Sequence, residues 1–364
     1  TQELVATPYR FKGNKHEAKR FFEKGLEMVF HNFREMTVPY YPVTIFYAFK
    51  QAGNQNEERQ TEEFSLDNER VSTGWETMLN GLLASSFEIT GTWPMRTELA
   101  NRSVGIGANA LASSIVLVCR PRAEDAPSVS RREFLAALNR ELPAALHRLQ
   151  RGNIAPVDLA QAAIGPGMAI FSRYSAVLES DGSPMSVHTA LALINRTLDE
   201  YLAEQESEYD SDSRWALAWF EQFGHEAGPY GIAETLSKAK NTGIERLTHA
   251  GFLEARGGTV RLLRRDELAK DWDPSVTKRV TVWEATQYLI RALDEEGEIG
   301  AGSLLGKLAE YGETIRDLAY RLYTLCERKG WAQDATAYNM LIIAWPQLKN
   351  LSDNRTESVQ ESLL

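Results

Sequence analysis

The stretch GIAETLSKAKNTGIERLTHAGFLEARGGTVRLL, residues 231–263, contains the clearest local pattern in the chain. Two short helical patterns, Gly231–Lys240 and Gly243–Ala250, are separated by two residues. Two strand-like runs follow, and Gly257-Gly258 between them is a pair that favours a tight hairpin turn. Helix, turn, helix and hairpin in this order predict a winged-helix-like module over residues 227–270.

This module is locally basic, although the whole chain is acidic. Residues 228–270 contain eight Lys/Arg and five Asp/Glu, whereas the 364-residue chain has a net charge of -10. Cations on the second helix and the wing of such a module can contact the DNA backbone or groove. The candidate DNA contacts are Lys238, Lys240, Arg246, Arg256, Arg261, Arg264 and Arg265. A protein-docking winged helix with solvated charges explains the same pattern, and both interpretations stay open.

Upstream, residues 1–122 show an α/β pattern. The run Val43–Phe49 is continuously apolar, as is typical of a strand buried on both faces. A helical pattern separates it from a second strand pattern, Phe87–Trp93, and a third, Ser113–Arg120, follows a Gly/Asn-rich loop. A helical crossover makes its two strands parallel, and the last two strands can pair antiparallel. We therefore expect an α/β fold followed by a mainly α region, with three strands of a Rossmann-like sheet, the last antiparallel.

The rest of the chain is predicted to be helical. The expected divisions are a helical region (127–226), the winged-helix-like module, C-terminal helices (271–350) and a polar tail (351–364). Ser130 with Glu133, and Thr281 with Glu284, have the spacing of capping boxes that begin helices. The acidic stretch Glu204–Asp212 reads as an exposed linker, and the aromatic stripe that follows it, Trp215 to Phe220, reads as core.

Composition excludes several classes of protein. With 43% hydrophobic and 25% charged residues, the chain is neither disordered nor fibrous. No apolar run approaches the ~20 residues that a membrane span needs. Cys119 and Cys326 lack metal-ligand spacing, so we expect no metal and a reducing, cytoplasmic location. Glycine-rich nucleotide loops, zinc-hydrolase histidine pairs and serine-hydrolase elbows are absent from the sequence, and no catalytic residue is assigned.

Several segments resemble the zinc-ribbon-containing family of adenine-specific DNA methylases. The most specific are Thr92–Glu98 (TWPMRTE) and Asn109–Arg120 (NALASSIVLVCR). Further similar segments are Thr7–Arg10, Phe46–Phe49, Arg131–Leu135, Ile154–Asp158, Gly165–Gly167, Phe171–Tyr174, Trp283–Thr286 and Cys326–Trp331.

The resemblance implies part of a DNA N6-adenine methyltransferase from a restriction-modification or anti-phage system. Such enzymes transfer a methyl group from S-adenosylmethionine to a flipped adenine. Their S-adenosylmethionine loop, Asp-Pro-Pro-Tyr motif and zinc-ribbon cysteines are not in this sequence. We therefore expect a C-terminal portion that is inactive alone, with the cofactor bound mainly by an upstream part. The expected partners are double-stranded DNA and that upstream half or other defence-system subunits. The alternative is a non-catalytic DNA-binding or scaffold subunit of a defence complex.

The resemblance also indicates where a target base would lie. Trp93, Pro94, Met95 and Arg96 correspond to one wall of the base pocket, and Asn109 lies in the adjoining loop. Stacking of Trp93 on a base would contribute ~1–3 kcal/mol. The alternative is that Trp93 packs in the core.

Overall fold

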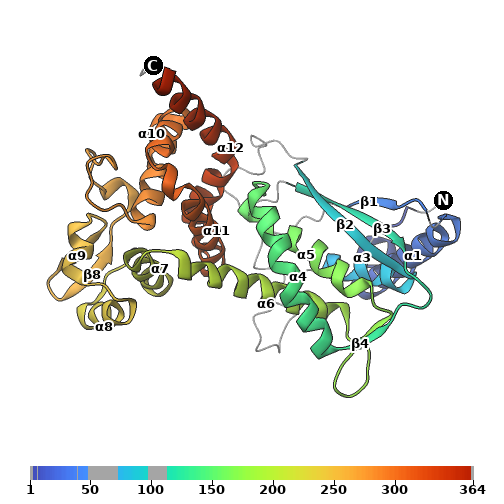
Figure 1. The fold of residues 1–364 in the computed structure, drawn as a ribbon. Coiled ribbons are helices and arrows are strands. Elements are labelled where there is room, and N and C mark those ends of the chain that lie inside the picture. Colours follow the sequence, from blue (N-terminus) through green and yellow to red (C-terminus); the bar gives the residue numbers. More distant parts are fainter. Residues whose placement is uncertain (1–2, 6, 39, 48–72, 97–112, 362–364) are drawn as a thin grey trace. The chain divides into compact units, whose positions relative to one another are not determined.

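The computed structural model describes residues 3–5, 7–38, 40–47, 73–96 and 113–361 (Figure 1). The chain divides into two compact units. The described part of the first lies within residues 3–152 and 158–199, and that of the second within 153–157 and 200–361. Helix accounts for 65% of the structure, and the strands form small separate sheets.

The sheet of the first unit contains β1 (Val43–Tyr47), β2 (Phe87–Arg96) and β3 (Ser113–Pro121). β3 lies in the middle and pairs antiparallel with both neighbours. The helix α3 (Thr73–Ala84) lies between β1 and β2 in sequence, and these two strands do not pair with each other. The edge of Tyr47 meets the buried ring of Trp75, which attaches β1 to α3.

The Rossmann-like methyltransferase sheet predicted for residues 1–122 is wrong, because no such sheet is evident among the described residues. The three strands form only antiparallel pairs, and β1 is a sheet edge. Burial alternates along β1, and Phe46 is 69% exposed. The continuous apolar run of β1 therefore belongs to a strand that is shielded from solvent on one face only. The prediction assumed that both faces are buried. The one parallel pair among the described strands joins β4 (Ser128–Ser130) to β5 (Ala176–Leu178).

The first unit is completed by helices. The segment η1 (Pro8–Phe11) precedes α1 (Lys15–Met36), and α4 (Arg131–Arg151), α5 (Pro156–Ser172) and α6 (Val187–Glu204) follow the sheet. The predicted capping box of Ser130 and Glu133 is confirmed at the start of α4. α5 runs without a break through Pro166.

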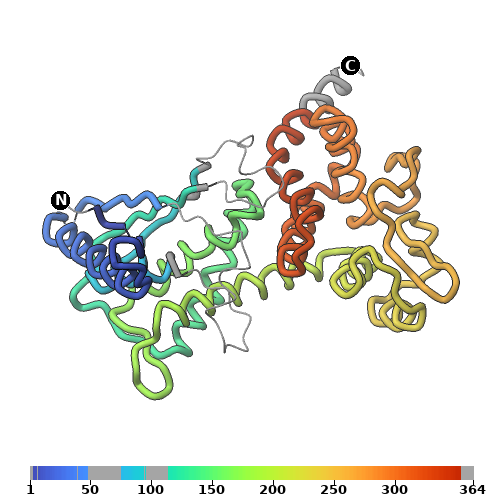
Figure 2. Tube along the Cα trace, turned by 180° about the vertical axis from the view of Figure 1, so that it is seen from behind, coloured from blue at the N-terminus to red at the C-terminus, as the bar shows by residue number. Residues whose placement is uncertain are grey.

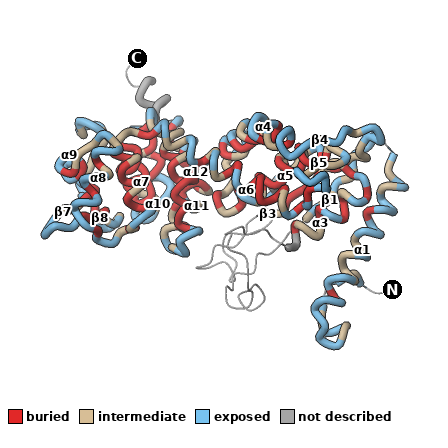
Figure 3. The backbone as a smooth tube through the Cα atoms, turned by 90° about the horizontal axis from the view of Figure 1, so that it is seen from below, coloured by how far each residue is buried: buried red, intermediate tan, exposed pale blue. Residues whose placement is uncertain are grey.

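Two glycines of α5 explain how this helix packs in the first unit. A Cβ atom on Gly165 would lie 2.0 Å from Oγ1 of Thr92 in β2. A Cβ on Gly167 would lie 2.5 Å from Cγ1 of Ile194 in α6. The backbone of α5 therefore lies close to β2 and α6 at its glycines, where no side chain separates them. Figure 3 shows that most residues of α5 are buried. At the end of α5, the Ser172 hydroxyl accepts a hydrogen bond from the Ile89 amide at 2.8 Å.

We predict that Gly165→Ala destabilises the first unit by about 1–3 kcal/mol, because the added methyl group overpacks a contact with the Cβ of Thr92 as well as its hydroxyl. Thermal unfolding of the variant measures this loss. Gly231→Ala is the control, since its Cβ would meet no atom within 4 Å and a helical alanine is neutral or favourable. Equal midpoints for Gly165→Ala and the unchanged protein would contradict the packing.

The second unit begins with three helices and a hairpin. These are α7 (Ser211–Phe223), α8 (Tyr230–Lys240) and α9 (Ile244–His249), with the short strand β6 (Gly228–Pro229) before α8 and then β7 (Leu253–Arg256) and β8 (Thr259–Leu262). The strands pair in the order β6-β8-β7, all antiparallel. The hairpin turns at Gly257 and Gly258, whose φ angles of 61° and 80° favour glycine. This order of elements is that of a winged helix.

Three long helices complete the second unit: α10 (Val282–Lys307), α11 (Gly312–Lys329) and α12 (Ala332–Glu361). They lie side by side, in orange to red in Figure 2, and α11 is largely buried. Short 3-10 segments η2 (Gln205–Glu208), η3 (Arg265–Glu267) and η4 (Ala309–Tyr311) occur in the connections. α10 bends at Gly297, where φ is 69°. In the described part of the chain, none of the helices has both the length and the apolar composition that a membrane crossing requires.

Candidate nucleic-acid interface

The first helix of the winged helix lies outside the module predicted at residues 227–270. Trp215, Trp219 and Phe220 of α7 are fully buried, so the prediction that this stripe is core is confirmed. The indole of Trp215 donates a hydrogen bond to the Ala233 carbonyl of α8 at 3.2 Å. Gly228 lies where a Cβ would be 2.7 Å from the Trp219 ring. The aromatic face of α7 is therefore the base on which α8 and the hairpin are built.

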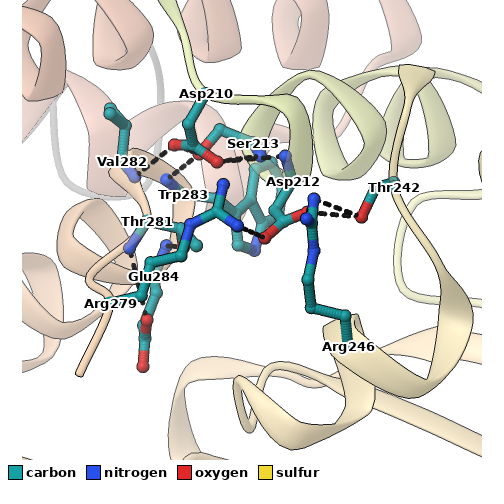
Figure 4. Close-up of polar contacts among 10 residues, drawn as sticks. All are labelled: Asp210, Asp212, Ser213, Thr242, Arg246, Arg279, Thr281, Val282, Trp283 and Glu284. Atoms are coloured by element: carbon teal, nitrogen blue, oxygen red, sulfur yellow. Dashed lines mark hydrogen bonds and ion pairs between the residues drawn. The ribbon is translucent and has the colours of Figure 1, made fainter. Parts of the chain in front are cut away.

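Two helix N-termini meet at Asp210 (Figure 4). One carboxylate oxygen of Asp210 accepts from the amides of Asp212 and Ser213 at the start of α7, at 3.0 and 2.9 Å. The other accepts from the Ser213 hydroxyl and, at 3.0 Å, from the Val282 amide of α10. The Ser213 hydroxyl in turn accepts from the Trp283 amide at 2.8 Å. The first amides of α7 and α10, which have no partner within their own helices, thus find acceptors. The negative charge of Asp210 also lies at the positive N-terminal ends of both helix dipoles.

Next to it, Asp212 holds the helix-turn-helix (Figure 4). Its buried carboxylate accepts from the hydroxyl of Thr242 in the α8–α9 turn and from Nε of Arg246 in α9, the latter at 3.0 Å. Arg246 also donates to the Thr242 hydroxyl at 2.8 Å. A second guanidinium, that of Arg279, lies 3.6 Å from the other oxygen of Asp212. The position of α9 therefore depends on one carboxylate of α7.

This cluster joins helices. The carboxylates of Asp210, Asp212 and Glu284 all accept hydrogen bonds from amides, a hydroxyl or a guanidinium, so we assign none of them to catalysis. The sequence analysis did not identify Asp210 and Asp212 as structural residues, because it predicted that Glu204–Asp212 is an exposed linker. That prediction is wrong for Tyr209 and Asp212, which are buried, whereas Glu204, Ser207 and Glu208 are exposed. An aspartate directly before an aromatic helical stripe was the signal of an N-cap.

We predict that Asp212→Ala lowers the free energy of unfolding by about 1–2 kcal/mol, because Thr242 and Arg246 lose their acceptor while the half-exposed guanidinium regains water. Urea unfolding at neutral pH measures the loss. Asp266→Ala is the matched control, since this exposed carboxylate forms no ion pair with a described residue. If the two variants were equally stable, Asp212 would not hold the turn.

Glu284 combines capping with deep burial. Its amide donates a hydrogen bond to the Thr281 hydroxyl oxygen at 3.1 Å, and its carboxylate accepts from the Thr281 amide, so the predicted capping box is confirmed. Burial raises the pKa of Glu284 to about 7, and the nearby charge of Asp210 adds to the shift. The folded protein therefore holds a proton on Glu284 at a pH where the unfolded chain has lost it.

This pKa gives a pH dependence with a definite sign. Between the usual glutamate pKa of 4.5 and about 7 the folded state binds more protons than the unfolded state, so stability falls as pH rises through this window. We predict that Glu284→Gln removes this component, so that its stability relative to the unchanged protein rises from acidic to neutral pH. Urea unfolding across that range tests the prediction. Glu298→Gln, at an exposed position of the same helix, should show a flat difference, and so would Glu284→Gln if this account were wrong.

Three of the candidate DNA contacts are engaged within the protein. Arg261 donates hydrogen bonds to Glu267 at 2.8 Å and to Glu254 at 2.6 Å; these bonds raise its pKa, and the two carboxylates balance its positive charge. Arg265 is largely buried and reaches Asp334 at 2.9 Å with its guanidinium over the Tyr338 ring. Arg264 lies 3.7 Å from Glu226. Arg261 and Arg265 therefore stabilise the base of the hairpin and its attachment to the three long helices, whereas the exposed pair of Arg264 and Glu226 contributes little.

The other four candidates lie at the surface of the helix-turn-helix and wing. Lys238 faces Glu234 one turn earlier on α8, at 3.3 Å and highly exposed. Lys240 ends α8 and Arg256 ends β7 beside the turn, and neither side chain forms a hydrogen bond or ion pair with a described residue. The side chain of Arg246 is 43% exposed although Asp212 holds it. These residues form the cationic part of the candidate interface.

The base-pocket candidates lie in the first unit. Trp93 is 57% exposed and Met95 is also exposed, so the alternative that Trp93 packs in the core is wrong. The Trp93 ring lies over Gly91, where a Cβ would be 2.9 Å from it. Pro94 and Arg96 lie in β2, where their backbones pair with Ile115 and Ser113 of β3. Their side chains, like the whole of Asn109, lie outside the described residues. Stacking of a base on Trp93 stays a prediction.

The lining of the cavity described in the second unit does not fit S-adenosylmethionine. This cofactor carries a positive sulfonium, a positive ammonium group and one carboxylate. The described cavity in the second unit is lined by Lys278, Arg279 and Lys307, whose charges oppose a cationic ligand. We therefore do not place this cofactor in that cavity, and we derive no chemical step through it.

Residues 210–363 are similar to a family described as "Domain of unknown function (DUF8807)". The matched stretch begins at Asp210, the N-cap of α7, and includes the winged helix and the three long helices. No curated protein and no solved structure matches the chain. The similarity covers most of the second unit and brings no activity with it.

Proposed function

We propose that this chain is a non-catalytic DNA-binding subunit that contacts duplex DNA through the winged helix of its second unit. The observation that carries the proposal is the pair Lys240 and Arg256. One ends the helix before the turn and the other lies at the wing, and neither is engaged with a described residue. In helix-turn-helix proteins the second helix, here α9, enters the major groove and the helix before it crosses the DNA backbone, so Lys240 and Arg256 lie on the elements that flank the recognition helix.

The turn between α8 and α9 is suited to this role because it is held before any ligand arrives. Asp212 fixes Thr242 and Arg246, so little side-chain entropy remains to be lost on binding. Arg246 uses Nε and one terminal nitrogen for these bonds, and its exposed side can donate to a phosphate. An arginine held by an acid keeps its full charge, unlike a lysine that burial can neutralise.

The charge of the module limits how strong such binding can be. Residues 210–270 contain nine Lys/Arg and nine Asp/Glu, so the basic character of residues 228–270 disappears once α7 is included. Binding would then rest on a few local phosphate contacts, with a modest salt dependence.

The equal numbers of basic and acidic residues in 210–270 also favour a second candidate function, a scaffold subunit whose winged helix docks onto another protein. Tyr230 and Ile232 are exposed at the start of α8, where an apolar partner surface could cover them. Salt-dependent duplex binding separates the two, because only phosphate contacts release counterions.

Methyl transfer to adenine, a defence system and a cytoplasmic location remain predictions from the sequence. The similar segments of the methylase family would make this chain the DNA-holding part of such an enzyme, and the catalytic part would come from elsewhere. Those segments and the free cations of the winged helix support the same kind of partner, double-stranded DNA.

We predict that the double variant Lys240→Glu/Arg256→Glu binds a short fluorescent duplex at least tenfold more weakly than the unchanged chain. The slope of log affinity against log salt should fall by about 2, one for each lost phosphate contact. Fluorescence anisotropy at several salt concentrations measures both quantities.

Lys329→Glu at the exposed end of α11 makes the same kind of charge change away from the interface and should bind like the unchanged chain. Because the control makes half the charge change of the double variant, a control that loses half as much log affinity would show an effect of net charge alone. Unchanged binding by the double variant would exclude the winged-helix interface.

A further inference from the structure

A cavity of about 440 Å³ lies beside the start of α10 in the second unit. It is formed by the loop before α10 and by the segment that joins α10 to η4. Its lining includes three cations, Lys278, Arg279 and Lys307, with Thr277, Glu310 and Tyr311. The volume falls within the range of small-molecule sites, roughly 300–1,000 Å³.

The loop that carries two of these cations is fixed by Asp273. The Asp273 carbonyl accepts from the Thr277 amide and, at 2.8 Å, from the Thr277 hydroxyl, which closes one helical turn. Its carboxylate accepts from the Ser275 amide at 2.9 Å and from Lys307 at 3.0 Å. One aspartate therefore holds the loop and ties it to the end of α10, so the walls are in place without a ligand.

The charges of the lining do not cancel. Lys307 is balanced by Asp273, and Arg279 faces Asp212 at 3.6 Å. Lys278 forms no hydrogen bond or ion pair with a described residue. Glu310 is the single acid among the lining residues, and Asp212 is shared between Arg246 and Arg279, so one positive charge remains in excess around the cavity. The cavity therefore attracts anions.

We propose that this cavity binds a small phosphate-bearing ligand through Lys278, Arg279 and Lys307. Arginine and lysine together suit phosphate, because a guanidinium offers paired donors and an ammonium a compact charge. The hydroxyls of Thr277 and Tyr311 can donate to further oxygens. The volume admits more than one phosphate group, so a diphosphate is the fitting class. The ligand is free in solution, and binding does not require the DNA contacts proposed above.

Lys278 is the residue that tests the site. Changing Arg279 would remove a cation from the buried Asp212, and changing Lys307 would release Asp273, so either variant could disturb the fold. Lys278 is exposed and unengaged, and its removal leaves these contacts intact.

Titration calorimetry of the full chain with inorganic pyrophosphate measures binding. We expect saturable binding, at least tenfold weaker for Lys278→Glu and little changed for Lys278→Arg. Lys329→Glu makes the same charge change outside the cavity and should bind normally. Absence of binding by the unchanged chain at millimolar pyrophosphate would overturn the proposal, as would equal weakening by Lys278→Glu and Lys329→Glu.

Measurements with duplex DNA distinguish a free phosphate ligand from a phosphate of the DNA backbone as the occupant of the cavity. Lys278→Glu should bind the fluorescent duplex normally, and Lys240→Glu/Arg256→Glu should bind pyrophosphate normally. Loss of duplex binding by Lys278→Glu without any pyrophosphate binding would mean that the cavity takes a backbone phosphate, which contradicts a free ligand. Failure of duplex binding would contradict the DNA proposal and leave the cavity proposal intact. Failure of pyrophosphate binding would contradict the cavity proposal and leave the DNA proposal intact.

Discussion

The second unit depends on two carboxylates at the start of one helix. Asp210 satisfies amides of both α7 and α10, and Asp212 holds the α8–α9 turn through Thr242 and Arg246 (Figure 4). Because helix ends leave amides without partners, their burial is possible only where such acceptors lie. The three long helices and the winged helix are thereby joined through one short segment of α7. The region similar to a known family begins at Asp210, the first residue of this junction.

The arginines of the hairpin region show how charge is divided between structure and surface. Arg261 and Arg265 are held by acids of the same unit, and their charges stabilise the hairpin base. The side chains of Lys240 and Arg256 form no hydrogen bond or ion pair with a described residue. A count of basic residues therefore overestimates a nucleic-acid interface, because it weights internal and free cations equally. The same reasoning distinguishes Lys278 from its neighbours in the cationic cavity, where Arg279 and Lys307 already face acids.

Local patterns allowed part of this structure to be predicted. The capping boxes at Ser130 and Thr281 and the Gly257-Gly258 turn are confirmed, because each depends on residues close in sequence. The Rossmann-like sheet was wrong, because the composition of Val43–Tyr47 does not reveal how many of its faces are covered. The junction was missed for a related reason: Asp212 meets Arg246 and Arg279, which lie 34 and 67 positions further along the chain, and no local pattern pairs them.

The central claim is that duplex DNA meets the α8–α9 turn and the wing. Amide hydrogen exchange of the full chain, measured with and without a short duplex, tests it most directly. The account predicts slower exchange on DNA binding within residues 238–246 and 256–259, and unchanged exchange in α11. Protection confined to other segments, or none at a duplex concentration that saturates binding, would contradict it.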